Sequence, residues 1–203
     1  MKYSDLASYV LLQVPSCPLF QIEQALRDSA IEFCTKTDAY LQEVEDLILI
    51  PGVDEYDLSP PSGTHVNHVL DIIRDGTPLT PVGMRYVRRK DQAGKPLRYT
   101  QTDSDTIVFI PTPDKAETLK VLYSLKPSQA SSSIPDVLAK ENTETLVHGA
   151  LWRLFRVAGT PWYSMSTANV YYEMFKRNMG EAIRKVRHGY SGATLTVQIP
   201  EFV

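Results

Sequence analysis

The hydrophobic period changes twice along the chain, and this constrains the fold more than any other feature. Over 19–37, LFQIEQALRDSAIEFCTKT, apolar residues recur every three or four positions, as on one face of a helix. Between about residues 43 and 126 they alternate, with frequent prolines and glycines, as in short strands. Helical spacing returns after residue 136. This order predicts an α+β protein in which a β unit is inserted into a helical bundle.

The first forty residues predict two helices. Ser4 is the expected N-cap of a short first helix, which the proline-containing segment 15–18 ends. The second helix, 19–37, is longer and amphipathic. Its apolar face is formed by Ile22, Leu26, Ala30 and Phe33.

The middle of the chain predicts about six short strands in an antiparallel sandwich or barrel. The Asp-Gly pair at 75–76 marks a tight hairpin turn. The stretch 109–127, FIPTPDKAETLKVLYSLKP, predicts a second hairpin with strands near 106–110 and 118–125. Pro111 and Pro113 would end its first strand, because proline donates no backbone hydrogen bond. We expect this hairpin to present a rigid edge or face to neighbouring molecules.

Two further helices are expected after the β unit. The first spans 137–158 and ends at Gly159; the second spans about 167–188, with Ser166 as its N-cap and Gly189 after its last turn. The apolar stripe of the last helix is formed by Tyr172, Phe175, Met179, Ile183 and Val186.

The chain therefore divides into four kinds of segment. Residues 1–41 and 136–189 form the helical bundle, 42–127 the β insertion and 128–135 a linker rich in serine. Residues 190–203, YSGATLTVQIPEFV, alternate polar and apolar residues and form an extended C-terminal arm. A lone strand of this kind either joins the protein's own sheet or adds to a partner's sheet.

Charge is distributed unevenly, although the net charge of −3 excludes a chain that is basic throughout. The segment 38–57 holds seven acidic residues and no basic one. The segment 84–98 holds six basic residues against one acid, and 176–188 holds five against one. These are either solvated faces or complementary faces of identical subunits that meet in a ring.

No motif in the chain predicts catalysis, a cofactor or a metal. A P-loop, GxSxG, HExxH and GxGxxG are all absent from the sequence. His65 and His68 form an H-x-x-H pair, but a strand directs them to opposite faces, so exposed histidines are favoured over metal ligands. Cys34 lies in a helical apolar pattern and is expected to be a buried reduced thiol rather than a nucleophile. The carboxylates of Asp103 and Asp105 are expected in a solvated turn.

The sequence predicts neither a signal peptide nor a transmembrane helix, so we expect synthesis in a cytoplasm. One basic run, RYVRRK, carries an interleaved tyrosine. It is either a solvated loop or a contact to DNA phosphates or to a neighbouring subunit. The candidate contact residues are Arg85, Arg88, Arg89 and Lys90.

Several stretches together resemble a family of tailed-phage proteins. They include QALRDSAIEFCTKT, VDEYDLSPPSG, RDGTPLTPV, TIVFIPTPD with LKVLYSLKPS, and HGALWRLFRVAGTPWYS. In order and spacing they resemble the head-to-tail adaptors (gatekeeper or tail tubular protein A-like proteins) of short-tailed bacteriophages. The resemblance covers about residues 1–200, and no single motif is diagnostic.

The resemblance implies a structural virion protein that forms a ring, commonly of twelve copies. Such a ring joins the portal protein to a tail nozzle or tail-tube protein, and genomic DNA passes through its lumen. It implies no catalytic residues, no cofactor and no membrane, and it places the protein at the head–tail interface of the virion. It also implies that the C-terminal arm binds the portal or a neighbouring subunit. The candidate arm residues are Tyr190, Leu195, Val197, Ile199 and Phe202.

Three alternatives remain open at this point. The chain could be another tail-completion or nozzle part, a nucleic-acid-binding protein that uses 85–98, or a metal hydrolase that uses His65 and His68. Acidic residues outnumber basic ones, which leaves open whether the lumen of a ring is acidic.

Overall fold

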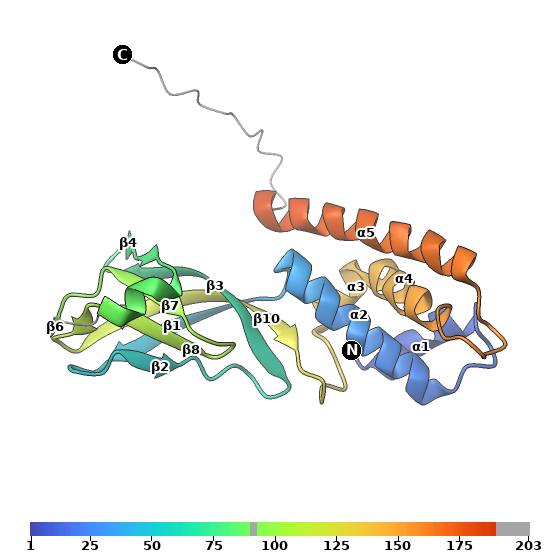
Figure 1. Cartoon of the computed structure of the whole chain (residues 1–203), viewed down its shortest axis with the longest axis horizontal. Helices are drawn as coiled ribbons and strands as arrows, with labels where there is room; N and C mark the ends of the chain where they lie inside the picture. The colour runs from blue at the N-terminus through green and yellow to red at the C-terminus, as the bar shows by residue number, and fades with distance from the viewer. Residues whose placement is uncertain (90–92, 190–203) are drawn as a thin grey trace, which may run out of the picture.

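The computed structural model describes residues 1–89 and 93–189 and shows an elongated α+β protein (Figure 1). The α-helices lie at one end and the strands at the other. The helices within the described residues are α1 (Tyr3–Leu11), α2 (Leu19–Thr37), α3 (Asp136–Glu141), α4 (Thr143–Leu154), α5 (Met165–His188) and the 3-10 helix η1 (Met84–Arg89). The strands are β1 (Leu41–Leu49), β2 (Glu55–Asp57), β3 (Thr64–Arg74), β4 (Thr77–Pro78), β5 (Thr80–Pro81), β6 (Ala93–Gly94), β7 (Arg98–Gln101), β8 (Thr106–Ile110), β9 (Thr112–Pro113) and β10 (Glu117–Pro127).

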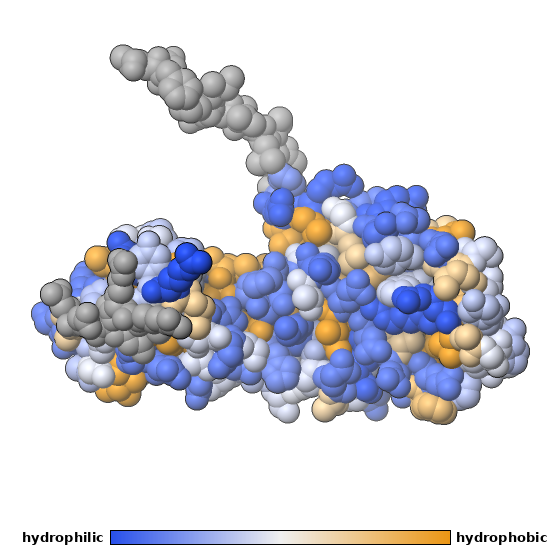
Figure 2. Space-filling view, viewed as in Figure 1, coloured by the Kyte–Doolittle hydropathy of each residue, from blue (hydrophilic) through white to orange (hydrophobic). Residues whose placement is uncertain are grey.

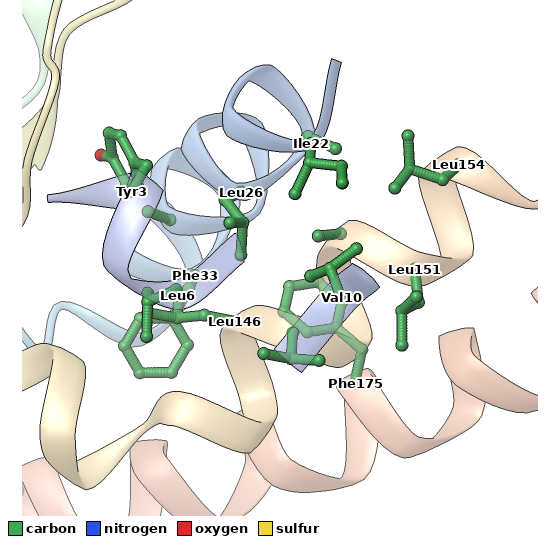
Figure 3. Packing of buried hydrophobic residues seen from close by; sticks show 14 of the residues in the cluster. Tyr3, Leu6, Val10, Ile22, Leu26, Phe33, Leu146, Leu151, Leu154 and Phe175 are labelled. Carbon is green, nitrogen blue, oxygen red and sulfur yellow. The ribbon is translucent and has the colours of Figure 1, made fainter. Parts of the chain in front are cut away.

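The helices from the two ends of the chain share one apolar core. Ile22 of α2 is fully buried among side chains of α1, α4 and α5, and Phe175 reaches this core from α5 (Figure 3). Burying one such side chain stabilises a fold by about 1.5–3 kcal/mol. The cluster therefore holds the N-terminal and C-terminal segments together across the β unit that separates them in sequence.

The prediction for α2 is confirmed, and the four residues expected on its apolar face are all buried. The predicted cap of α1 is wrong. Its N-cap is Lys2 rather than Ser4, because the carboxylate of Asp5 accepts a hydrogen bond from the backbone N–H of Lys2 at 3.0 Å. The helix consequently begins at Tyr3, two residues earlier than a cap at Ser4 would allow.

The single helix predicted over 137–158 is wrong. The chain forms two helices, α3 and α4, with a break at Asn142, whose backbone φ of −124° is not helical. The Asn142 side chain donates to the carbonyl of Leu138 at 2.9 Å, and such local side-chain bonds compete with the helix. The α4 helix also ends at Leu154, before Gly159. The last helix begins two residues before the predicted start, because Ser164, not Ser166, caps it.

The buried face of α5 differs from the predicted stripe. Phe175 and Met179 are buried as expected, but Tyr172 is exposed and Ile183 and Val186 are half-buried. The small residues Ala168 and Ala182 complete the buried face, together with Phe175 and Met179. Alanine is less apolar than isoleucine or valine. The sequence pattern therefore favoured the larger residues Ile183 and Val186 over the buried Ala182.

The strands form two four-stranded sheets and one two-stranded sheet. Their orders are β1-β10-β3-β4, β2-β8-β7-β5 and β6-β9. Most pairs are antiparallel, whereas β5–β7 and β6–β9 are parallel. Within the described residues no sheet closes into a barrel, so the barrel alternative is not realised. The two larger sheets contribute to one apolar cluster that includes Val66, Phe109 and Tyr123.

The two hairpins predicted from sequence have different outcomes. The turn at Asp75–Gly76 is confirmed, because Arg74 pairs with Thr77 and both turn residues have the positive φ that a two-residue hairpin requires. The hairpin predicted over 106–125 is wrong. Its strands, β8 and β10, belong to different sheets. Both edges of β10 are already paired, by β1 and β3, so β8 has no edge of β10 to join.

The two ends of the molecule are joined by hydrogen bonds as well as by the chain. The segment 128–135, predicted as a linker, is bound to the N-terminus: Ile134 N–H donates to the Met1 carbonyl at 3.0 Å. Arg27 of α2 donates to the Ser131 carbonyl at 2.7 Å. The chain also connects the two ends between α2 and β1. There Asp38 ends α2 in the left-handed region, and its carboxylate accepts hydrogen bonds from Asn67 of β3 and Ser124 of β10.

Candidate interaction surfaces

The histidine and cysteine candidates do not form a reactive site. His65 Nδ1 lies 3.2 Å from Asp105 Oδ2, and His68 Nδ1 lies 3.0 Å from Asp38 Oδ1, so each histidine contacts a different carboxylate. Among the described residues no group of three or more histidine, cysteine or acidic side chains could hold a metal. Cys34 is fully buried, as predicted, and burial raises the pKa of its thiol to about 12. The thiol is therefore protonated near neutral pH and unsuited to nucleophilic attack.

The turn that holds Asp103 and Asp105 has a structural use. Asp103 Oδ1 accepts backbone N–H bonds from Asp105 and Thr106, both at 2.9 Å. The backbone bond from Asp105, followed by the bonds from Thr106, holds the pKa of the Asp103 carboxyl below its ordinary value. The Asp105 carboxylate accepts a bond from Val66 N–H at 3.1 Å, and this bond connects β3 to the turn before β8. These carboxylates stabilise the fold of the β part.

The turn between β1 and β2 presents apolar side chains to solvent. Ile50 is 56% exposed, and Val53, at the other end of the turn, is also exposed. Val53 N–H donates to the Ile50 carbonyl at 3.1 Å, with Pro51 and a positive-φ Gly52 between them. This is the arrangement that a type II turn requires. The Tyr56 hydroxyl lies within hydrogen-bonding distance of both ends of the turn, so the apolar side chains are held in a fixed position.

Removing this hydroxyl tests whether it holds the turn. Tyr56→Phe is expected to speed amide hydrogen exchange over 50–53 by about ten-fold, because the exposed Ile50 N–H loses its acceptor at 2.8 Å and such a bond contributes about 0.5–1.5 kcal/mol. The Tyr9→Phe variant is a matched control, since Tyr9 is about half exposed on α1. Equal exchange in Tyr56→Phe and the wild-type chain would show that the hydroxyl does not restrain the turn.

The described part of the predicted basic run lies in the short helix η1, together with the exposed Tyr86. Arg85 is exposed in η1, and Arg88 and Arg89 belong to the same short helix. Lys90 lies outside the described residues. The guanidinium of Arg98, on the neighbouring strand β7, lies 5.7 Å from the centre of the Tyr86 ring.

The helical end carries a cluster of aromatic and cationic side chains. The guanidinium carbons of Arg153 and Arg156 both lie over the ring of Trp152, at 4.7 and 4.8 Å from its centre. The Trp152 ring also contacts Tyr172, with ring centres 5.1 Å apart, and the ammonium of Lys176 lies 4.7 Å from the centre of the Tyr172 ring. Such cation–π contacts each contribute about 0.5–1 kcal/mol at exposed sites.

A cavity of about 430 Å3 opens beside this cluster, lined by residues that include Trp152, Arg156 and Tyr172. Tyr172 was expected on the apolar stripe of the last helix, but hydrophobic spacing does not reveal its cationic partner. One spacing carries the signal: Tyr172 and Lys176 are four apart on α5 and so share a face. Arg156 follows Trp152 by four residues but lies just past the end of α4.

Further exposed apolar residues lie on α1, on α2 and between them. They are Tyr9, Leu12, Leu19 and Phe20. Exposed apolar side chains scattered singly are ordinary on soluble proteins, whereas a group of them marks an interaction surface. The molecule therefore exposes apolar side chains both on its helical end and on the turn between β1 and β2. The arm residues predicted from sequence, Tyr190 to Phe202, lie outside the described residues.

These surfaces indicate the class to which the protein belongs. In the described part of the chain, the titratable candidates are paired or buried, and the exposed features are apolar, aromatic and cationic side chains on a well-packed body. No helix in that part is long and apolar enough to cross a bilayer. The arrangement is that of a structural interaction protein.

Comparison with known proteins gives the family. The model of the SU10 adaptor protein family matches residues 1–198. A search of curated proteins found no match. The chain belongs to the SU10 adaptor protein family, which makes it a structural phage adaptor and a component of the virion. It associates with other head or tail components, and its family is not an enzyme family.

Proposed function

We propose that this adaptor is the subunit of a ring that joins the portal vertex to the tail and lines the channel through which DNA passes. The observation that carries the proposal is the family match over nearly the whole chain. Twelve copies, the portal protein on one side and a tail nozzle or tail-tube protein on the other are the arrangement that we propose. The chain is synthesised in the host cytoplasm and works without a cofactor.

The two ends of the molecule have separate roles in this proposal. The helical bundle, 1–41 and 136–189, is the body of the subunit, and the β insertion, 42–127, is a sandwich that projects from it. Two separate apolar clusters, one among the helices and one among the strands, support this division. Exposed apolar surface on both parts supports contacts with different neighbours.

Two groups of residues are proposed to make the partner contacts. The arm residues Tyr190, Leu195, Val197, Ile199 and Phe202 bind the portal or a neighbouring subunit. The basic residues Arg85, Arg88, Arg89 and Lys90 contact DNA or a neighbouring subunit. The exposure of Arg85 supports the second assignment.

The portal protein encoded in the same genome provides the test. Full-length adaptor mixed with portal is expected to add a ring that is visible by negative-stain microscopy. A chain that ends at Gly189 is expected to lose this binding, while its circular dichroism and thermal midpoint show that it is folded. If neither version binds the portal, the ring proposal is wrong. Binding to a tail protein alone would instead make the chain a tail-completion part.

DNA binding is measured in the same preparation. If the basic run contacts DNA, neutralising Arg85, Arg88 and Arg89 together will weaken binding and reduce its dependence on salt. Portal binding that survives this triple substitution would separate the DNA contact from the subunit contact.

A further inference from the structure

An apolar groove lies where the two parts of the molecule meet. It is a cavity of about 220 Å3 between the end of α5, α3 and the start of β1. Figure 2 shows apolar surface directly beneath the C-terminal end of α5. We name this cavity the junction groove. Its lining residues are Ala39, Leu41, Leu138, Glu141, Asn142, Ala182, Lys185, Val186 and Gly189.

The chemistry of the junction groove suits an aliphatic occupant. Leu41 is 46% exposed at its wall, and Leu138 and Val186 are half-buried. The charged groups at the rim satisfy each other, because Lys185 Nζ lies 3.9 Å from Glu141 Oε2. The groove therefore offers concave apolar surface without an unpaired charge that would call for an ionic ligand.

One wall of the junction groove continues into the edge of a sheet. β1 begins at Leu41 and pairs on one side with β10, from Leu41 opposite Ser124 to Leu49 opposite Glu117. It is the first strand in its sheet order, so its other side pairs with no strand among the described residues. The backbone N–H and C=O groups on that side form a template for one more strand.

The chain itself supplies a segment with the matching pattern at the matching place. The described chain ends at Gly189, and Gly189 lines the junction groove. The Ser191–Gly192 pair that follows is a turn signal. After it, Leu195, Val197 and Ile199 alternate with polar residues, so in an extended conformation they share one face.

The distances allow this segment to return to the groove. Leu195 is six positions after Gly189, and extended chain spans about 3.3–3.6 Å per residue, which gives a reach of about 20 Å. A segment tethered this closely has an effective concentration in the millimolar range, which favours its own groove over that of a second molecule.

We infer that residues 194–199 of the same chain dock in the junction groove, with Leu195 and Val197 against its apolar wall and the backbone along the free edge of β1. This inference does not rest on the ring, because it concerns the chain before assembly. The consequence is competition for this segment. While Leu195 and Val197 lie in the junction groove they cannot contact a partner, so a partner must first displace the segment from the groove.

Disulfide trapping in the full-length chain tests the docking. The variant Leu41→Cys with Leu195→Cys is expected to form an intramolecular disulfide under mild oxidation, at a rate independent of protein concentration. The matched control is Leu41→Cys with Thr196→Cys, which presents the opposite face of the segment and is expected to react about ten-fold more slowly. The native Cys17 and Cys34 are buried and do not interfere.

Other results would overturn the inference. Equal rates for the two cysteine pairs would show an undocked tether, and disulfide-linked dimers would show that a second copy fills the groove. Hydrogen exchange gives an independent readout. The amides of 41–49 are expected to exchange about ten-fold more slowly in the full-length chain than in a chain that ends at Gly189. Equal exchange would exclude pairing with β1, whatever the result of the portal experiment.

Discussion

Replacing Gly149 with alanine is expected to destabilise the helical part by about 2 kcal/mol, although alanine is the better helix former. Gly149 lies in α4 where this helix crosses α2 and α5. A Cβ at this position would collide with the Ser29 hydroxyl and would lie 2.8 Å from a ring carbon of Phe175. Ser29 and Phe175 are both fully buried, and Ser29 Oγ donates to the Leu146 carbonyl at 2.9 Å, so neither side chain moves aside without cost.

Gly180→Ala is the matched control for this prediction. Gly180 also lies in a helix, α5, but a Cβ there would meet nothing within 4 Å. The substitution is expected to stabilise the protein by about 0.5–1 kcal/mol, which is the ordinary propensity gain. Urea unfolding of both variants gives the comparison. If Gly149→Ala were as stable as Gly180→Ala, this result would contradict the close packing of α2, α4 and α5 around Gly149.

The helical part was largely predictable because its signals are local. The period of 19–37 places Ile22 and Phe33 on the buried face of α2, and both are buried. The errors arose where a single side chain decides the outcome. Asn142 breaks one predicted helix into two by bonding to the backbone behind it, and Ser164 caps α5 in place of Ser166. The spacing of apolar residues contains no information about either of these polar side-chain effects.

Strand pairing was not predictable in the same way, because it depends on residues far apart in sequence. The apolar runs of β8 and β10 are compatible both with a hairpin and with strands in two sheets. The choice is made by β1 and β3, which occupy both edges of β10. The prediction of the turn at Asp75–Gly76 was confirmed because Asp-Gly readily adopts the two positive φ angles of a tight hairpin, so the signal is local.

The interaction surfaces were predicted only in part for a related reason. The basic run is contiguous in sequence and could be seen, whereas Trp152 and Tyr172 come from different helices and meet only in the folded chain. The same holds for the junction groove, which combines Leu41, Leu138 and Val186 from three elements. The arm residues and the ring remain predictions.

Replacing Asp38 with alanine is expected to destabilise the junction between the two parts by about 2–3 kcal/mol. The Asp38 carboxylate accepts hydrogen bonds from the side chains of Ser124, Asn67 and His68, so it links the end of α2 to β3 and β10. Ser124 is fully buried and would lose its best acceptor. Asp38 also has a φ of 52°, which aspartate and asparagine tolerate better than alanine.

The Asp38→Asn variant separates the charge from the backbone effect. Asparagine retains a carbonyl acceptor and tolerates the same φ, so it is expected to cost about half as much as alanine. The difference between wild type and Asp38→Asn should depend on pH. Burial alone would raise the pKa of the Asp38 carboxyl, but the bonds from Ser124, His68 and Asn67 outweigh it and lower the pKa.

The sign of the pH dependence follows from this lowered pKa. A carboxyl whose pKa is lower in the folded state stabilises the fold fully above its unfolded value, about 3.9, and loses this contribution as the pH falls through the folded value. Urea unfolding at pH 7 should therefore separate wild type from Asp38→Asn clearly, and the gap should close below about pH 4. A gap that stayed constant down to pH 3 would mean that the ionised carboxylate does not hold the junction. In that case the packing of α2 against β10 and the hydrogen bonds of 128–135 to the N-terminus would have to hold the two parts together.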